Sequence, residues 1–187
     1  MYKNKNVMID IETLSTSPNA IILTIGAIVF ETDETIDLKV LETDKAFYRK
    51  VSIQSCKDLN MDIDSDTEKW WNQQNDKTRY EAIDDPTNRL PIQTVLKEFS
   101  EWLKINTINN FKIWANSPSF DCVILKEAYK ACKLPLPWKF WLERDIRTLF
   151  DITDIKSYDL PNSNKHNALY DCYRQISGVQ QSYQKLI

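Results

Sequence analysis

The feature that most restricts the fold of this chain is a largely apolar, β-branched run at residues 20–30, AIILTIGAIVF. It follows Pro18-Asn19 and ends at a charged segment, which is typical of a buried strand. The run is much shorter than the roughly 20 residues that a membrane-spanning helix needs. Two further strands are predicted at 7–13 and 47–53, and the short connections between the three strands favour an antiparallel meander.

Beyond the third strand the apolar period changes from two to 3.6, which predicts helices with short strands between them. We expect helices at 65–74, after Pro91, at 119–133 and at 167–185, and strands at 111–115 and 142–146. Residues 65–68 (SDTE) form a capping box, and Ser119 and Asn167 are the expected caps of the last two helices. This order predicts a single α/β or α+β domain over residues 1–187, with one sheet of five strands and helices on its faces.

Composition excludes several classes of protein. The chain has only two glycines, so no glycine-rich phosphate loop or dinucleotide fingerprint is present, and P-loop NTPases and Rossmann dehydrogenases are ruled out. Four scattered cysteines without a CxxC pair, and one histidine, argue against a structural zinc site and suit reduced thiols. The N-terminal sequence has no signal-peptide core, so we expect a cytoplasmic protein without membrane contact.

The charge balance argues against one way of binding nucleic acid. The net charge is −3, from 24 basic and 27 acidic residues, whereas binding through bulk electrostatics needs a basic domain. The objection is weaker for an enzyme that reaches phosphate through divalent cations, because a metal-holding carboxylate cluster makes the sequence acidic.

Asp10 and Glu12 lie in the first predicted strand, where alternation places both side chains on one face, about 7 Å apart along the chain. A divalent cation between them would relieve their repulsion. The alternative is a strand that runs out into solvent and carries two ordinary surface acids.

Three later residues are candidates for the same site. Asp121 falls in the first turn of a helix after a strand, where open α/β sheets place ligands, although acids are common at helix starts in any case. Asp171 lies in the first turns of the last helix, and His166 lies in the loop before it. A lone loop histidine is otherwise an ordinary surface residue.

The order of these parts is more specific than any one of them. The motifs Asp10-Ile11-Glu12-Thr13, Asn116-x-x-x-Phe120-Asp121 and HNALYD at 166–171 resemble the three motifs of DnaQ-like 3′–5′ exonucleases that use four acids and a histidine. Within that superfamily, stretches such as TEKWWNQQ and WANSPSFDCVILKEAY look like the phage and prophage exodeoxyribonuclease VIII-like proteins. Bacterial exoribonucleases of the same branch are more distantly similar. The resemblance covers almost the whole chain.

The resemblance implies a ribonuclease H-like α/β fold, with a central mixed five-stranded sheet of three antiparallel and then two parallel strands. It also implies phosphodiester hydrolysis with two divalent metal ions, Mg²⁺ or Mn²⁺. At the matching positions, Asp10 would bridge both ions, and Glu12 and Asp171 would hold the ion that carries the attacking water. Asp121 would support the second ion, and His166 would be the general base. These residue types suit the chemistry, because hard cations select oxygen ligands and a near-neutral imidazole accepts a proton.

The expected substrate contacts are Thr13, Leu14, Trp70, Trp71, Asn116 and Phe120. The resemblance places the first two against the terminal nucleotide. Adjacent tryptophans point in different directions on a helix, so at most one stacks on a base, and the alternative is that both lie in the core. Arg144 and Arg147 either reach phosphate or form structural ion pairs with Asp145.

We therefore expect a 3′–5′ exonuclease that acts on the 3′ end of single-stranded nucleic acid and releases 5′-mononucleotides. DNA is favoured over RNA through the nearer resemblance. The alternatives are an exoribonuclease of the same fold, a non-catalytic module that binds nucleic-acid ends, and a nucleotide phosphatase. The resemblance also suggests a phage or prophage protein of a bacterial cytoplasm, and relatives of this kind include homodimers. Cys172 stands where the family usually has Ala, and a small buried Cys should fit as well.

Overall fold

The computed structural model describes residues 4–157, 160 and 166–186. A mixed six-stranded sheet lies at its centre, in the order β4-β3-β2-β1-β5-β6. The strands are β1 (Asn4–Thr13), β2 (Ile22–Phe30), β3 (Ala46–Val51), β4 (Arg89–Leu90), β5 (Thr107–Ala115) and β6 (Glu143–Asp145). The first three strands pair antiparallel, and β5 and β6 extend the sheet in parallel from β1. The predicted α/β class, meander and parallel pair are confirmed. The sheet has one strand more than expected, because the short β4 pairs with β3.

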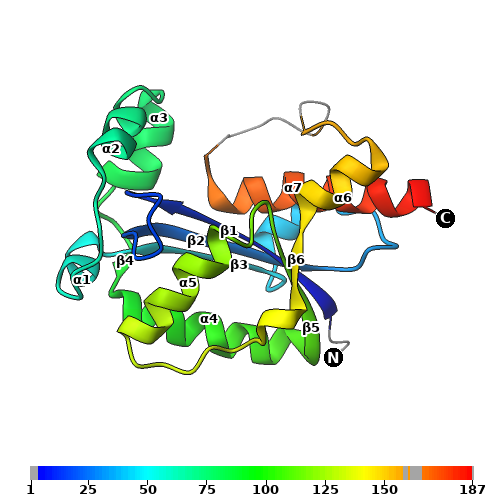
Figure 1. Ribbon diagram of the computed structural model, residues 1–187, viewed down its shortest axis with the longest axis horizontal. Coiled ribbons are helices and arrows are strands. Elements are labelled where there is room, and N and C mark those ends of the chain that lie inside the picture. Colours follow the sequence, from blue (N-terminus) through cyan, green and yellow to red (C-terminus); the bar gives the residue numbers. More distant parts are fainter. Residues whose placement is uncertain (1–3, 158–159, 161–165, 187) are drawn as a thin grey trace.

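Helices cover both faces of this sheet (Figure 1). They are α1 (Ile53–Lys57), α2 (Ser65–Asn72), α3 (Asp76–Arg79), α4 (Ile92–Asn106), α5 (Asp121–Ala131), α6 (Ile146–Thr153) and α7 (Ala168–Leu186), with the short turns η1 (Leu38–Glu42), η2 (Tyr80–Asp84) and η3 (Phe140–Leu142). In Figure 1, α6 and α7 lie on one face, and α4 and α5 lie on the other. None of the helices in the described segments is long and apolar enough to cross a membrane.

The alternation of β1 divides its side chains between two cores. Val7, Ile9 and Ile11 pack in the core that contains the apolar faces of α4 and α5. Met8 packs on the opposite side, with α6 and α7. Because side chains alternate along a strand, Asp10 and Glu12 continue the Met8 side and emerge on the α7 face. The two carboxylates therefore share one face, as the sequence predicted.

Gly26 explains how α7 comes close to these carboxylates. Every residue of β2 is buried, as predicted for the apolar run. Gly26 pairs with Asp10 across the β1–β2 ladder. A Cβ atom at Gly26 would lie 2.5 Å from the backbone of Ala168, at the start of α7. Only a glycine lets the two backbones approach this closely, so the start of α7 passes beside Asp10.

The helix starts correct two of the predicted caps. α2 begins after Asp64, whose carboxylate accepts two backbone hydrogen bonds, so Asp64 and not Ser65 is its N-cap. A carboxylate at this position also benefits from the helix dipole. α5 follows Phe120 without a side-chain cap, so the prediction of Ser119 as the cap is wrong. Asn167 caps α7 as predicted, because its side-chain oxygen accepts hydrogen bonds from the first turn of the helix.

Candidate active site

Three carboxylates meet where the end of β1 lies beside the start of α7. One oxygen atom each from Asp10, Glu12 and Asp171 lies within 4.8 Å of the other two. Asp10 and Glu12 come from one face of β1, and Asp171 comes from the first turn of α7. Residues that are far apart in the sequence are thus brought together as the motifs predicted.

Asp121 approaches this group from the other edge of β1. The parallel pairing of β1 with β5 reaches only Met8, so the backbone N–H of Ile11 has no strand partner on that edge. Asp121 fills this place: its Oδ1 accepts a hydrogen bond from the Ile11 N–H at 3.3 Å. Its side chain is buried at the first position of α5. Asp121 therefore lines the site but stands outside the close group of three.

The four acids line one hollow of about 610 Å³, which we call the acidic cleft. Its lining residues are Asp10, Ile11, Glu12, Asn116, Ser117, Phe120, Asp121, Arg147, His166, Asp171, Arg174 and Gln175. All five predicted catalytic residues belong to this lining, as do two of the predicted substrate contacts, Asn116 and Phe120.

The crowding of carboxylates changes their proton affinity. Burial, and after it the charges of the other three acids, raises the pKa of Asp10 well above its usual value. Burial and the charges of Asp171 and Asp121 raise the pKa of Glu12 in the same way. Burial also raises the pKa of Asp121 to about 7. A bound divalent cation would reverse this effect, because it stabilises the charged carboxylates.

The donor set of the cleft fits such a cation. Carboxylate oxygens are the ligands that Mg²⁺ and Mn²⁺ prefer. Gln175 is an independent indication: its Nε2 donates a hydrogen bond to Oδ1 of Asp10 at 2.8 Å. Its Oε1 is buried and has no hydrogen-bond partner among the residues that the structure describes. Buried polar atoms normally have a partner, and a hydrated cation at the cluster would supply the missing donor.

Four residues that line the acidic cleft were not predicted as site residues from the sequence: Ile11, Ser117, Arg174 and Gln175. Two of these four bind the carboxylates through their side chains. Arg174 places Nη2 at 2.9 Å from Oδ1 of Asp171, and Gln175 binds Asp10. They follow Asp171 by three and four positions on the same helix. Residues with this spacing share a helix face, so the signal was present in the sequence.

His166 enters the cleft from the segment before α7. Its backbone is in the left-handed region, with φ 63°. Its backbone N–H donates a hydrogen bond to Oδ2 of Asp171 at 2.9 Å. Its imidazole stands edge-on to the indole of Trp70, with 4.8 Å between ring centroids. The histidine thus lies between α2 and the carboxylates.

A second hollow, of about 430 Å³, adjoins the acidic cleft and is called the apolar pocket here. Its lining residues are Ile11, Glu12, Thr13, Thr16, Asp64, Asp66, Thr67, Trp70, Trp71 and Phe120. It shares Ile11, Glu12 and Phe120 with the acidic cleft. A ligand could therefore place an apolar part in the pocket and a charged part in the cleft.

The adjacent tryptophans both line the apolar pocket, but they differ in burial. Trp71 is 1% exposed, and its Nε1 donates a hydrogen bond to the carbonyl oxygen of Thr13. Trp70 is 39% exposed and forms a wall of the apolar pocket. Thr13 also lines this pocket, whereas Leu14 is buried in the core and lines neither hollow.

The two predicted arginines also differ. Arg147 lines the acidic cleft, where its Nη2 donates a hydrogen bond to Oγ of Ser117 at 2.8 Å. It also forms a longer ion pair with Asp145, at 3.8 Å. Arg144 instead donates to the backbone carbonyls of Trp141 and Glu143. Of the two, only Arg147 faces the cleft.

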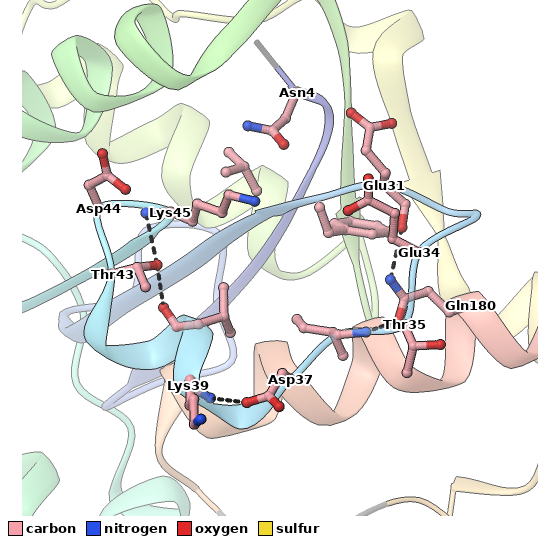
Figure 2. A pocket seen from close by; sticks show the side chains of 14 residues that line it. Asn4, Glu31, Glu34, Thr35, Asp37, Lys39, Thr43, Asp44, Lys45 and Gln180 are labelled. Atoms are coloured by element: carbon pink, nitrogen blue, oxygen red, sulfur yellow. Dashed lines mark hydrogen bonds between the residues drawn. The ribbon is translucent and has the colours of Figure 1, made fainter. Parts of the chain in front are cut away.

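A third hollow, of about 320 Å³, lies at the opposite end of β1, beside η1 (Figure 2). Asn4, Glu31, Lys45 and Gln180 are among its lining residues. Both polar atoms of the Gln180 amide have a partner, because Nε2 donates to the carbonyl of Glu31 and Oε1 accepts from the N–H of Ile36. This hollow therefore lacks the orphaned buried atom found in the acidic cleft, and none of the predicted site residues lines it.

Comparison with known proteins shows the family of the chain. A family model of the 3′–5′ exoribonuclease Rv2179c-like domain matches residues 5–183. The chain is also similar to a protein named exodeoxyribonuclease from Enterobacteria phage T4, with 25% identity over 198 residues that cover 90% of this chain and 85% of that protein. Both names describe exonucleases, although they differ in the sugar of the substrate. The chain belongs to the Rv2179c-like family of 3′–5′ exonuclease domains and is a hydrolytic exonuclease of the DnaQ-like kind that acts on nucleic acid.

Proposed function

We propose that this exonuclease removes nucleotides from the 3′ end of single-stranded nucleic acid with two divalent cations, Mg²⁺ or Mn²⁺. Asp10, Glu12, Asp121 and Asp171 would hold the cations. The observation that carries the proposal is the group of three carboxylates whose oxygens lie within 4.8 Å of one another. Acids packed this closely repel one another, and such arrangements are expected where a cation or a proton takes part in function.

The chemistry divides among the residues of the acidic cleft. When bound, divalent cations stabilise negative charge on the attacking and leaving oxygens of the phosphodiester. Asp10 would help to hold both cations, as the resemblance to DnaQ-like exonucleases implies. His166 accepts the proton of the attacking water, and Arg147 is placed to contact a phosphate oxygen.

The apolar pocket supports recognition of a terminal base. Trp70, Phe120 and Ile11 line it directly beside the carboxylates. Aromatic side chains stack on any base, so binding there would tolerate different sequences. Thr13 and Asn116 are proposed as polar contacts of the terminal nucleotide. The buried side chain of Leu14 leaves only its backbone for this role.

DNA is the preferred substrate in this proposal, and RNA is the second candidate. The phage T4 relative, named exodeoxyribonuclease, supports DNA. The family description, which names an exoribonuclease, favours RNA. The likeness to a phage protein further supports a phage or prophage origin and action in a bacterial cytoplasm. We also propose a single domain over residues 1–187, and a homodimer would be tested by sedimentation.

A direct test uses single-stranded DNA and RNA of one sequence, labelled at the 5′ end and incubated with Mg²⁺, Mn²⁺ or EDTA. We expect a ladder that shortens from the 3′ end with either cation and no shortening in EDTA. Asp10→Asn should lose more than about 100-fold in rate. Loss of a residue that only hydrogen-bonds to a metal ligand usually costs about 10- to 100-fold, and loss of a ligand itself should cost more. Asp33→Asn changes an exposed acid outside the acidic cleft and the apolar pocket. It is the matched control and should keep full activity.

Each alternative gives a different result in the same assay. Binding of 3′ ends without shortening of either strand would indicate a non-catalytic module and overturn the proposal. Release of inorganic phosphate from free mononucleotides, with oligonucleotides left intact, would indicate a phosphatase. Faster shortening of RNA than of DNA would assign the ribonuclease activity.

A further inference from the structure

Trp70 lies between the buried ring of Trp71 and the imidazole of His166 in the acidic cleft. Its indole is edge-on to Trp71, with 5.0 Å between centroids, and edge-on to His166, with 4.8 Å. Trp71 is immobilised by burial and by its hydrogen bond to the carbonyl of Thr13, in the strand that carries Glu12. Trp70 keeps one open surface toward the apolar pocket, because it is 39% exposed and lines that pocket.

The edge-on contact with Trp70 restricts the orientation of the His166 imidazole. The backbone of His166 is fixed by its hydrogen bond to Asp171. A backbone bond does not choose the side-chain rotamer, since rotation about χ1 remains open. An edge-to-face contact does restrict the ring, because the positive edge of one ring is attracted to the negative face of the other. The indole therefore favours an imidazole position at the rim of the cleft.

We propose that Trp70 couples occupation of the apolar pocket by a nucleobase to the position of the His166 imidazole. This inference rests on the proposed function, in which the pocket takes the terminal base and His166 takes a proton. A base in the pocket packs on the open surface of Trp70 and removes the freedom that the indole retains. The edge contact then holds the imidazole toward the carboxylates. Trp70 is thus a positioning residue that lets the enzyme sense whether the 3′-terminal nucleotide carries a base.

The coupling predicts how the rate responds to the terminal base. A 3′-terminal nucleotide without a base leaves Trp70 unpacked, so its removal is slow even though the carboxylates are intact. An aromatic pair of this kind corresponds to a change in kcat of about 3- to 10-fold. Trp70→Leu should lower kcat for a normal strand by that factor and should have little further effect on a strand with a terminal abasic nucleotide. Effects that pass through the same contact do not add.

The single histidine of the chain makes the coupling directly observable. The imidazole Cε1–H signal in a ¹H–¹³C NMR spectrum reports on His166 alone, and the indole ring current shifts it. Trp70→Leu should move this signal, and Trp70→Phe should restore part of the wild-type shift. Trp141→Leu is the matched control, because Trp141 is 56% exposed and packs on Phe140 in η3, outside the acidic cleft and the apolar pocket. Circular dichroism checks that each variant is folded.

Nucleotide titration completes the experiment. Thymidine 5′-monophosphate should move the His166 signal of the wild-type protein, whereas deoxyribose 5-phosphate, which lacks a base, should not. In Trp70→Leu the response to the nucleotide should be reduced. The inference is overturned if Trp70→Leu leaves the His166 signal unchanged. It is also overturned if Trp70→Leu lowers kcat for an abasic strand by the same factor as for a normal strand. Failure of the proposed function is seen separately, as a wild-type protein that shortens no strand.

Discussion

Asp10 is the residue on which the contacts of the acidic cleft converge. Burial and then the charges of three carboxylates raise the pKa of Asp10, and the amide of Gln175 opposes them with a hydrogen bond of 2.8 Å. The amide donates to Oδ1 of Asp10 and thereby restricts how the carboxylate is turned. In metal sites, such partners of the ligands set their orientation and basicity.

Gln175→Leu is expected to weaken Mn²⁺ binding by about 10- to 100-fold, as is typical for loss of a partner of a metal ligand. Isothermal titration calorimetry with Mn²⁺ measures this. Gln180→Leu is the matched control, because Gln180 is also buried in α7 but binds the backbone of Glu31 and Ile36, far from the cleft. The control should lose thermal stability and keep its Mn²⁺ affinity. Equal affinity losses in both variants would show that Gln175 acts only through stability.

The raised pKa values also predict a pH dependence of stability without metal. Burial raises the pKa of Asp121 from its usual 3.8 to about 7, so the folded protein holds a proton that the unfolded chain releases near pH 4. This proton's contribution to the free energy of unfolding is complete below pH 4 and is lost as the pH rises through 7. Asp10 and Glu12 shift in the same direction. Each pKa unit corresponds to about 1.4 kcal/mol.

We therefore expect the Tm of the protein in EDTA to fall by several degrees between pH 5 and pH 8. Saturating Mn²⁺ should remove most of this fall, because the cation stabilises the charged carboxylates. Differential scanning calorimetry across this range measures the effect. Asp121→Asn should show a smaller fall in EDTA. A metal-free Tm that rises with pH would contradict the assignment of these acids to one buried cluster.

Among the elements, the contact between β2 and α7 has the greatest influence on the site. α7 carries Asp171, and it reaches Asp10 because Gly26 leaves room for the backbone of Ala168. The atoms that a Cβ at Gly26 would meet belong to the backbone, which cannot move aside as a side chain can. The position of the third carboxylate is thus linked to one residue of a buried strand.

Gly26→Ala is expected to lower the free energy of unfolding by about 1–3 kcal/mol, as overpacking does in a dense core. It should also weaken Mn²⁺ binding, because the start of α7 has to shift. Gly178→Ala provides the comparison within α7, since the Cβ there would meet the side chain of Phe150, away from the cleft. Both variants should lower the Tm, but only Gly26→Ala should change the Mn²⁺ affinity. Unchanged affinity in Gly26→Ala would show that α7 can adjust without moving Asp171.

At the scale of the whole molecule, the acidic balance of the chain has a consequence for substrate binding. With a net charge of −3, the protein has little general attraction for phosphate. In the proposed function, its affinity for a strand would come from the cations and from the apolar pocket. Binding is therefore expected to depend on cations and on a free 3′ end.

Fluorescence anisotropy with a labelled single strand measures this dependence. We expect weak binding in EDTA, with a Kd above about 100 μM, close to the weak limit of non-specific binding. Ca²⁺, which occupies carboxylate sites, should tighten binding at least about 10-fold. A circular single strand of the same sequence offers no 3′ end and should gain much less. Tight binding in EDTA that Ca²⁺ does not change would contradict the model of recognition.

The sequence by itself determined the features that depend on local geometry. Alternation along a strand placed Asp10 and Glu12 on one face, and the apolar run at 20–30 predicted the buried β2. Asn167 was recognised as a cap because capping involves only the first turn of its own helix. The motif order led to Asp121, His166 and Asp171, and the structure brings them into one cleft. Their catalytic roles remain predictions.

Only the tertiary structure decided how separate segments meet. The pairing of Gln175 with Asp10, the bond between Asp121 and the amide of Ile11, and the contact between Trp70 and His166 join residues from different elements. Periodicity gives the face of an element that is apolar, but it does not give the distance or angle between two elements. Those follow from close packing of the whole chain, in which the small size of Gly26 sets how near α7 comes to β1 and β2.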